Sequence, residues 1–189
     1  MNRIHHWLCR SNIWKRKLGS QVIPWALRDV QLGERVLELG PGPGLTTDIL
    51  RQRFASLTSI EVDPQLAASL RSRLHGTNVD VVDGSATAMP FPDESFSGVV
   101  SFTMLHHVPS RELQDQLFRE TYRVLKPQAS FVATDSRSSW SMRLFHIADT
   151  MILIDPNTVQ ARLEKAGFCE VFVEPVSYTH LTLPTILRV

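Results

Sequence analysis

The chain has 189 residues, 43% of them hydrophobic and 21% charged, which is typical of one folded domain and excludes a largely disordered chain. Residues 1–28 carry six basic side chains and no acid, whereas the remainder holds 14 basic and 19 acidic residues; because phosphate binding needs a basic surface, this acidic body argues against nucleic acid as the main partner. Cys9 and Cys169 are too far apart in sequence, and too few, for a disulfide framework or a metal site. The sequence also shows neither a membrane-spanning apolar run nor the pattern of a signal peptide. We therefore expect a soluble, cytoplasmic protein without a metal.

In chain order, short apolar runs alternate with helical patterns. This alternation predicts an α/β fold with a Rossmann-like, doubly wound, mostly parallel sheet and helices on both faces. We expect strands at 35–39, 57–61, 79–82, 99–102, 130–134 and 169–173, and helices at 45–53, 66–74, 113–124 and 158–166. Asp63 and Pro64 supply the cap and the first-turn proline of the second helix. Residues 86–95 predict a loop, and the irregular stretch 136–155 predicts an insertion or lid.

The N-terminal stretch, residues 1–28, places apolar residues at near-helical spacing with basic residues between them. This pattern predicts an N-terminal helical lid that packs on the pocket of the following domain, residues 29–175. A membrane-surface helix that serves a lipid-like substrate is the alternative.

The strongest local signal is the run Val36–Gly44, in which a buried strand leads into glycines at positions 40, 42 and 44 and then into a helix. Glycine is needed where a turn takes left-handed backbone angles or where a ligand touches the backbone. A dinucleotide fingerprint has its third glycine one position later, where Leu45 stands, and a phosphate-binding loop ends in a lysine that is missing here. The turn therefore favours a nucleoside without phosphates, and S-adenosylmethionine (SAM) is one.

Acidic residues accompany this turn. Glu61 ends the second strand 21 residues after Gly40, where an acid in such a fold accepts hydrogen bonds from ribose hydroxyls. Asp83 ends the third strand, in a position to face an adenine edge. Glu38 lies inside the first strand, and a buried acid must have a partner. SAM carries a sulfonium and an ammonium against one carboxylate, so acids near the pocket suit it.

As a set, five motifs resemble the class I SAM-dependent methyltransferases, particularly the small-molecule group that includes ubiquinone/menaquinone-biosynthesis C-methyltransferases. The resemblance spans about residues 35–173, and its motifs are Val36–Gly44, Ser59–Pro64, Val82–Phe96, Met104–Val108 and Tyr122–Pro127.

The resemblance implies a SAM site assembled at the ends of four strands. Gly40–Gly44 would lie against the methionine and ribose parts of SAM, and Glu61 would bind the ribose diol. Asp83 would meet the adenine amino group, with Gly84 supplying backbone contacts. The last two residues of the fourth strand, Ser101 and Phe102, would border the sulfonium and the methyl group.

The sequence departs from the family pattern at three places. Gln128-Ala129 replaces the usual Gly-Gly after Lys-Pro, so that turn is expected to be altered, and Ser97 replaces an acid before the fourth strand. The last residues, from Val176, resemble a translated sequencing adapter. We therefore expect residues 176–189 to be a poorly packed, non-native tail and the family's terminal antiparallel strand to be missing or replaced.

SAM's methyl group is already activated, so the implied enzyme mainly positions a small-molecule acceptor for in-line attack without a metal. His106 and His107 follow the fourth strand and are the candidate catalytic bases; the alternative is that they pack against the domain and cap the start of a helix. His146 and Asp149 lie in the expected insertion, either as part of a substrate cover or as solvated residues. The alternatives to an enzyme of this kind are a non-catalytic SAM-binding protein, used in sensing or assembly, and a nicotinamide oxidoreductase.

Overall fold

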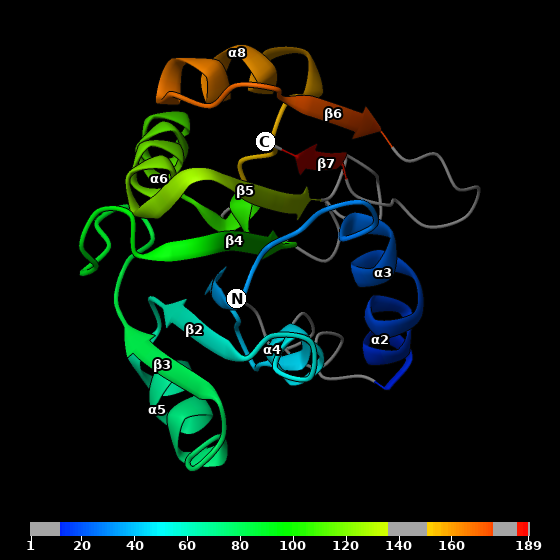
Figure 1. Ribbon diagram of the computed structural model, residues 1–189, viewed down its shortest axis with the longest axis vertical. Coiled ribbons are helices and arrows are strands. Elements are labelled where there is room, and N and C mark those ends of the chain that lie inside the picture. Colours follow the sequence, from blue (N-terminus) through cyan, green and yellow to red (C-terminus); the bar gives the residue numbers. More distant parts are fainter. Residues whose placement is uncertain (1–11, 136–150, 176–184, 189) are drawn as a thin grey trace.

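The computed structural model describes residues 12–135, 151–175 and 185–188, which form a layered α/β domain around one sheet (Figure 1). Within these residues the strand order is β3-β2-β1-β4-β5-β7-β6. The strands are β1 (Arg35–Leu39), β2 (Ser56–Glu61), β3 (Val79–Asp83), β4 (Phe96–Phe102), β5 (Leu125–Asp135), β6 (Phe172–Pro175) and β7 (Thr185–Arg188). The first five are parallel, and β7 is antiparallel to both of its neighbours. The predicted Rossmann-like class is confirmed.

Helices connect the parallel strands at the places that the sequence predicts. They are α4 (Leu45–Leu50), α5 (Pro64–Arg73), α6 (Arg111–Val124) and α8 (Pro156–Ala166), preceded by α2 (Asn12–Lys17), a π-helical turn η1 (Leu18–Val22) and α3 (Ile23–Ala26). Both α6 and α8 begin two residues before the expected start, because Ser110 and Asp155 cap their first backbone N–H groups. Apolar periodicity shows the packed face of a helix and misses its polar first turn.

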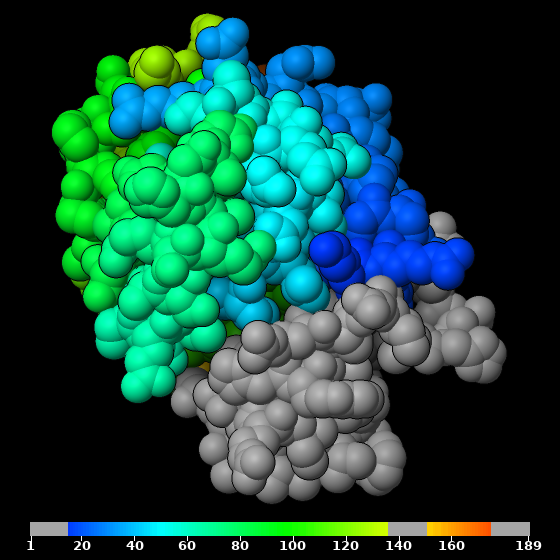
Figure 2. Space-filling view, turned by 90° about the horizontal axis from the view of Figure 1, so that it is seen from below, coloured from blue at the N-terminus to red at the C-terminus, as the bar shows by residue number. Residues whose placement is uncertain are grey.

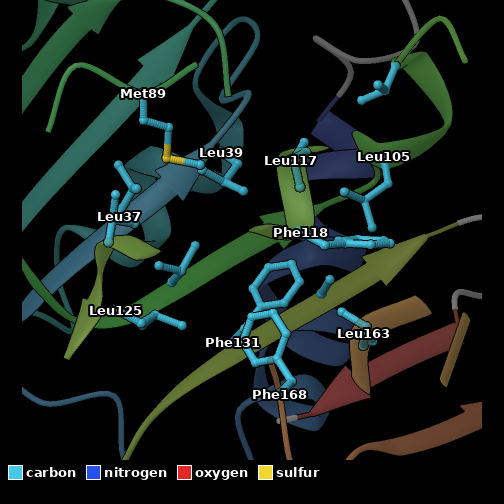
Figure 3. Close-up of a cluster of buried hydrophobic side chains, with 14 of the residues drawn as sticks. Leu37, Leu39, Met89, Leu105, Leu117, Phe118, Leu125, Phe131, Leu163 and Phe168 are labelled. Carbon is cyan, nitrogen blue, oxygen red and sulfur yellow. The ribbon is translucent and has the colours of Figure 1, made fainter. Parts of the chain in front are cut away.

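The sheet separates two hydrophobic clusters. On one face, α6 and α8 cover alternate residues of β1, β4 and β5, and this cluster includes the stacked rings of Phe131 and Phe168, whose centroids are 5.9 Å apart (Figure 3). On the other face, the N-terminal helices and α4 cover Val36, Val100 and Val132. β1, β4 and β5 thus contribute side chains to both faces in turn, as expected for a sheet covered on both sides.

The described part of the expected N-terminal lid belongs to this second cluster. Leu18, Val22, Ile23 and Ala26 are buried against the sheet and α4, and in Figure 2 the N-terminal helices lie beside the surface formed by α4 and α5. Residues 1–11 lie outside the described residues. From Leu18 to Ala26 the segment therefore helps to form the core.

Two of the departures from the family pattern have local explanations. Gln128 stands where the family usually has the first glycine of the pair, and it has a φ of 63°. Glycine adopts this left-handed conformation without the steric cost of a Cβ atom, which explains the family's preference for glycine here. Ser97 uses its hydroxyl twice, accepting from Arg35 N and donating to Arg35 O at 3.0 Å each. This reciprocal pair ties the start of β4 to the start of β1, so the serine has a structural use of its own.

At the C-terminal end, the structure corrects the start of one strand and decides between the two expectations for the last one. The sixth strand begins at Phe172 instead of Cys169, because Gly167 and Glu170 take positive φ angles and keep the chain in a turn. Of the two expectations for the terminal antiparallel strand, missing or replaced, the structure has the second: Thr185–Arg188, from the tail, forms β7 between β5 and β6. The remaining tail residues, 176–184 and Val189, and residues 136–150 of the expected insertion, with His146 and Asp149, lie outside the described residues.

Candidate functional site

The glycine turn leaves β1 at the carboxyl edge of the parallel strands. Gly40, Gly42 and Gly44 have φ angles of 61°, 55° and 86°, so all three positions favour glycine. A Cβ atom at Gly40 would overlap the Met104 side chain, and one at Gly44 would overlap Leu70, whereas one at Gly42 would have no atom within 4 Å. Gly42 is thus the glycine of the turn that faces open space, and the other two are required by packing.

Glu61, the last residue of β2, is fixed against this turn. Its Oε2 accepts a hydrogen bond from Gly42 N at 2.9 Å, and its Oε1 accepts one from Asp63 N at 3.0 Å. The side chain is only 6% exposed. A carboxylate oxygen has two lone pairs, so each Glu61 oxygen keeps one acceptor position after binding its backbone donor. Two remaining acceptor positions on one oriented carboxylate match the two hydroxyls of a ribose.

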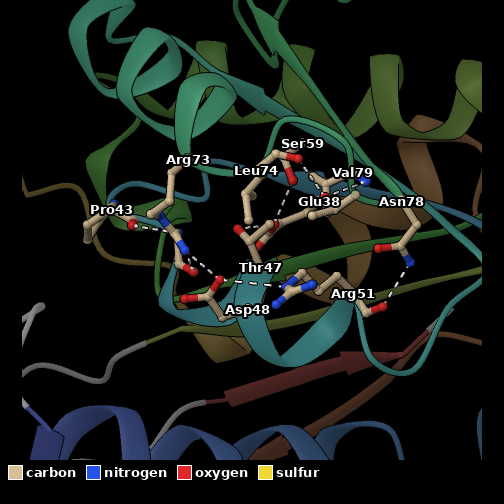
Figure 4. Close-up of polar contacts among 12 residues, drawn as sticks. Glu38, Pro43, Thr47, Asp48, Arg51, Ser59, Arg73, Leu74, Asn78 and Val79 are labelled. Carbon is tan, nitrogen blue, oxygen red and sulfur yellow. Dashed lines mark hydrogen bonds and ion pairs between the residues drawn. The ribbon is translucent and has the colours of Figure 1, made fainter.

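Glu38 lies beneath the turn, 1% exposed, with three hydroxyl partners (Figure 4). Thr46 and Thr47, from the first turn of α4, and Ser59 of β2 all donate to its carboxylate. Burial raises the pKa of Glu38, the three hydroxyl donors oppose this, and the nearby Glu61 charge adds to the rise. The predicted need for a partner is confirmed. The hydrogen bonds give Glu38 a supporting position that holds α4 and the turn against the sheet.

The adenine-side candidates lie at the end of β3. Asp83 is exposed, and its carboxylate makes no hydrogen bond to another residue in the described part of the chain. Gly84 N donates to Glu61 O at 2.9 Å, which joins this strand end to that of β2. A Cβ atom at Gly84 would lie 3.3 Å from Ile60 Cδ1, so the Ile60 side chain would have to shift by a few tenths of an ångström to admit a larger residue. The structure therefore brings Asp83, Gly84 and Glu61 together at one edge.

The end of β4 holds the predicted sulfonium-side residues. Ser101 is fully buried, and its hydroxyl has no hydrogen-bond partner among the described residues; Phe102 is 5% exposed and packs toward the N-terminal helices. The next residue, Thr103, has a φ of 53°, which is a strained conformation for a β-branched residue. Such strain is characteristic of functional sites, and here it redirects the chain from β4 into the turn that carries Met104.

The two candidate histidines differ in their surroundings. Both belong to the 3₁₀ turn η2 (Leu105–His107), and their rings are in contact, with centroids 4.2 Å apart. His106 is 2% exposed, and its Nδ1 forms a hydrogen bond with Asp135 Oδ1, from the end of β5. His107 is only partly buried.

Sequence reasoning missed two residues of this region, Asp135 and Gln114. Gln114 of α6 is fully buried; its side-chain amide donates to Leu105 O and Ile152 O and accepts from Arg162. Asp135 ends β5 just as Glu61 ends β2, so the rule that singled out acids at strand ends applies to it too. No sequence signal points to Gln114, because its partners come from three other segments.

The charges around the turn fit a cofactor without phosphates. Arg73 of α5 lies against Pro43 and Gly44, but its guanidinium is held by Asp48 at 2.6 Å (Figure 4). Among the described residues no cluster of three or more metal-binding side chains occurs, and no helix is long and apolar enough to cross a membrane. The open position at Gly42, the two acceptor positions of Glu61 and the exposed Asp83 fit SAM.

Comparisons with known proteins agree with this geometry. A family model described as a methyltransferase domain matches residues 37–133. A probable S-adenosylmethionine-dependent methyltransferase from Mycolicibacterium smegmatis is 29% identical over 85% of this chain and 61% of its own length. A ubiquinone biosynthesis O-methyltransferase from Pseudomonas entomophila is 29% identical over 79% of this chain and 66% of its own length. This chain thus spans less than two thirds of the length of either relative.

Two further similarities are of a different extent. A probable ribosomal RNA small subunit methyltransferase A from Methanothermobacter thermautotrophicus is 44% identical, but over only 39% of this chain and 26% of its own length. A phosphoethanolamine N-methyltransferase 2 of Haemonchus contortus, solved in complex with SAM, superposes with a TM-score of 0.69 at 19% identity over 93% of this chain and 46% of that chain. The family model covers more than half of the chain, which therefore belongs to the SAM-dependent methyltransferases, and SAM is the cofactor that the sequence predicts.

Proposed function

We propose that this chain transfers the methyl group of SAM to a small-molecule acceptor. The observation that carries the proposal is the position of the Glu61 carboxylate at the carboxyl edge of the sheet. The backbone N–H groups of Gly42 and Asp63 orient it, and each of its oxygens can accept one further hydrogen bond. Ligands of open α/β sheets bind at this edge. SAM supplies a methyl group that its sulfonium has already activated for attack.

The residues at this edge divide the work of holding SAM. Glu61 would bind the ribose hydroxyls, Gly40–Gly44 would lie along the methionine and ribose parts, and Asp83 with Gly84 would meet the adenine. Ser101 and Phe102 would border the methyl group, and Glu38 would act from below by fixing the first turn of α4. His106 and His107 are the candidate bases for an acceptor that must lose a proton.

Two observations support a small-molecule acceptor over RNA. The ubiquinone-related relative matches along 79% of the chain, whereas the ribosomal RNA relative matches along only 39%. In addition, the chain after residue 28 carries more acidic than basic residues, and RNA binding needs the opposite balance. A lipid-like acceptor and a cytoplasmic location remain predictions.

Calorimetric titration with S-adenosylhomocysteine (SAH) tests the cofactor site. Gly42→Val should abolish SAH binding, because a branched side chain there would fill space that the structure keeps free of protein atoms and would resist the left-handed angle. Gly76→Val is a matched control: Gly76 has a φ of 76°, and a Cβ atom there would also have no neighbour within 4 Å. Because Gly76 lies between α5 and β3, this variant should suffer the same strain and still bind SAH. Unchanged affinity in a folded Gly42→Val variant would refute the site.

The acceptor class is tested with SAM carrying a labelled methyl group. Oleic acid, 3,4-dihydroxybenzoate, a sterol and a ribosomal RNA transcript should be offered separately, and we expect label in a small molecule. Label in the transcript alone would refute the small-molecule proposal. SAH binding without transfer to any acceptor would favour the remaining alternative, a non-catalytic SAM-binding protein.

A further inference from the structure

The N-terminal helices, α4 and α5 lie side by side on one face of the sheet (Figure 2). Ile49 of α4 lies against Gly19 of the N-terminal helices, where a Cβ atom would be 3.5 Å from Ile49 Cδ1. Arg73 of α5 forms an ion pair with Asp48 of α4 at 2.6 Å. Beneath them, Val79 packs on both the cluster under α4 and the cluster under α5. The three elements therefore share one outer surface, which we call the helical layer.

Basic residues far outnumber acidic ones in the helical layer. Its three segments hold seven lysines and arginines and one acid. The segments are residues 12–26, 45–54 and 64–74, and the basic residues are Lys15, Arg16, Lys17, Arg51, Arg53, Arg71 and Arg73. The acid, Asp48, lies 2.6 Å from Arg73 and 3.8 Å from Arg51, so one carboxylate faces two guanidinium groups. Seven positive charges and one negative charge leave the layer a net charge of +6.

Several of these positive charges face solvent without an acidic partner. Lys15, Arg16 and Arg53 are exposed, and none of them forms an ion pair with a described residue. Arg71 is exposed as well, and its guanidinium donates to a neutral carbonyl, Val81 O, at 3.0 and 2.9 Å. A carbonyl oxygen fixes the side chain but does not neutralise its charge. The layer therefore presents its positive charge to whatever lies outside it.

The helices on the opposite face of the sheet are balanced in charge. α6 carries three basic and three acidic residues, and α8 carries two basic residues and one acid. Some of these charges neutralise one another: Arg162 pairs with Asp115 at 2.6 Å, and Arg123 pairs with Glu120 at 2.8 Å. The excess of positive charge is therefore a property of one face of the described domain.

We propose that the helical layer docks on a membrane surface that carries anionic lipids, a role that does not depend on the methyl transfer. Clusters of lysine and arginine bind the negatively charged surface of such bilayers. The sequence before α2 adds Arg3 and Arg10 and no acid. The same stretch holds Ile4, Trp7 and Leu8, and apolar residues between basic ones are typical of segments that bind at a membrane interface. Charge complementarity and this composition both favour a lipid surface.

RNA is the other large polyanion that a basic face could bind, but two observations favour the membrane. A substrate RNA would have to lie along the cofactor edge, where the exposed Asp63 and Asp83 would repel its phosphates. Single-stranded RNA is also recognised by aromatic side chains that stack on its bases. The large hydrophobic residues that are exposed among the described ones are Val62, Tyr122 and Phe172, and none belongs to the helical layer. A bilayer needs only the basic surface itself.

Vesicle sedimentation with the full chain tests the docking without SAM or an acceptor. Vesicles of phosphatidylcholine mixed with phosphatidylserine should bind the wild type, and vesicles of phosphatidylcholine alone should bind it about tenfold or more weakly. Binding to the anionic vesicles at about 0.1 M salt should be lost at about 1 M, where the screening length falls to about 3 Å. Each basic residue near an anionic bilayer contributes about fivefold to the binding constant.

A triple variant removes three exposed charges from the helical layer. It combines Lys15→Gln, Arg16→Gln and Arg53→Gln, and it should bind the anionic vesicles about a hundredfold more weakly than the wild type. Thermal melting checks its fold, which should be kept because the three side chains are exposed and form no ion pair with a described residue. The single variants, each expected to lose about fivefold, test the same surface if the triple variant does not fold.

A control triple variant removes the same charge from the opposite face. It combines Arg111→Gln, Arg119→Gln and Lys165→Gln, at exposed positions of α6 and α8, and it should bind the vesicles like the wild type. Equal losses in the two triple variants would overturn the proposal, because binding would then follow total charge. Equal binding of the wild type to neutral and anionic vesicles would overturn it too. Tighter binding to a ribosomal RNA transcript than to anionic vesicles at equal phosphate concentration would assign the face to RNA instead.

Discussion

Replacing Glu61 by glutamine tests how the site recognises the ribose. The glutamate accepts hydrogen bonds at both oxygens, from Gly42 N at 2.9 Å and from Asp63 N at 3.0 Å. Glutamine has the same shape but replaces one oxygen by an N–H donor, so one backbone partner and one ribose hydroxyl lose their acceptor. A hydrogen bond to a charged group contributes about 1.5–3 kcal/mol, and each 1.4 kcal/mol is about tenfold in affinity. We therefore expect SAH to bind about ten- to a hundredfold more weakly.

The assay is calorimetric titration with SAH and with an SAH analogue that lacks both ribose hydroxyls. The loss caused by Glu61→Gln should be much smaller for the analogue, since part of the interaction that the mutation removes is already absent. Glu34→Gln, an exposed residue next to the amino end of β1, is the matched control and should bind both ligands normally. Equal losses for the two ligands would show that Glu61 supports the turn without contacting the ribose.

Two other predictions concern stability. Burial raises the pKa of the Glu38 carboxyl above its ordinary value of 4.5, so the native state binds the carboxyl proton more tightly than the unfolded state does. The contribution of Glu38 to the wild-type free energy of unfolding should therefore fall as the pH rises above 4.5, until the raised pKa is passed. Glu38→Gln should remove that contribution, and urea unfolding at several pH values measures it; an identical slope in both proteins would contradict the assigned burial. In the inner strand β7, Leu187→Pro removes a ladder N–H and should cost about 1–3 kcal/mol relative to Leu187→Ala, which keeps it. Equal urea midpoints for these two variants would show that β7 contributes nothing.

Local signals predicted the parts of this molecule that depend on neighbouring residues. The strand at 35–39 and the glycine turn after it are found as expected, because three apolar residues and three alternate glycines specify them within ten positions. The acids at 61 and 83 follow from the rule that parallel strands end at a common edge. Glu38 was recognised as a buried acid, but its three hydroxyl donors come from α4 and β2 and depended on the packing.

The parts that the sequence did not predict are those with distant partners. Asp135 pairs with a histidine 29 residues earlier, and this depends on β5 extending to Asp135 and on η2 folding back beside it. The Gln114 side chain forms hydrogen bonds with Leu105, Ile152 and Arg162. The apolar periodicity of a helix does not predict a buried glutamine whose amide nitrogen and oxygen are both hydrogen-bonded. Buried polar groups are hydrogen-bonded, but their partners become identifiable only when the elements are in place.

In the tail, the main chain forms a strand of the sheet although the sequence does not resemble the family's terminal strand. Residues 176–189 resemble an unrelated sequence, yet the last four described residues, Thr185–Arg188, fill the antiparallel position between β5 and β6. A sheet ladder is made of main-chain groups, and β-branched residues such as Thr185 and Ile186 suit it whatever their origin. Without β7, β5 and β6 would each expose an unpaired edge, which favours pairing with any strand available. The proline ahead of Thr185 cannot donate to a ladder, which fits a strand that begins only after Pro184.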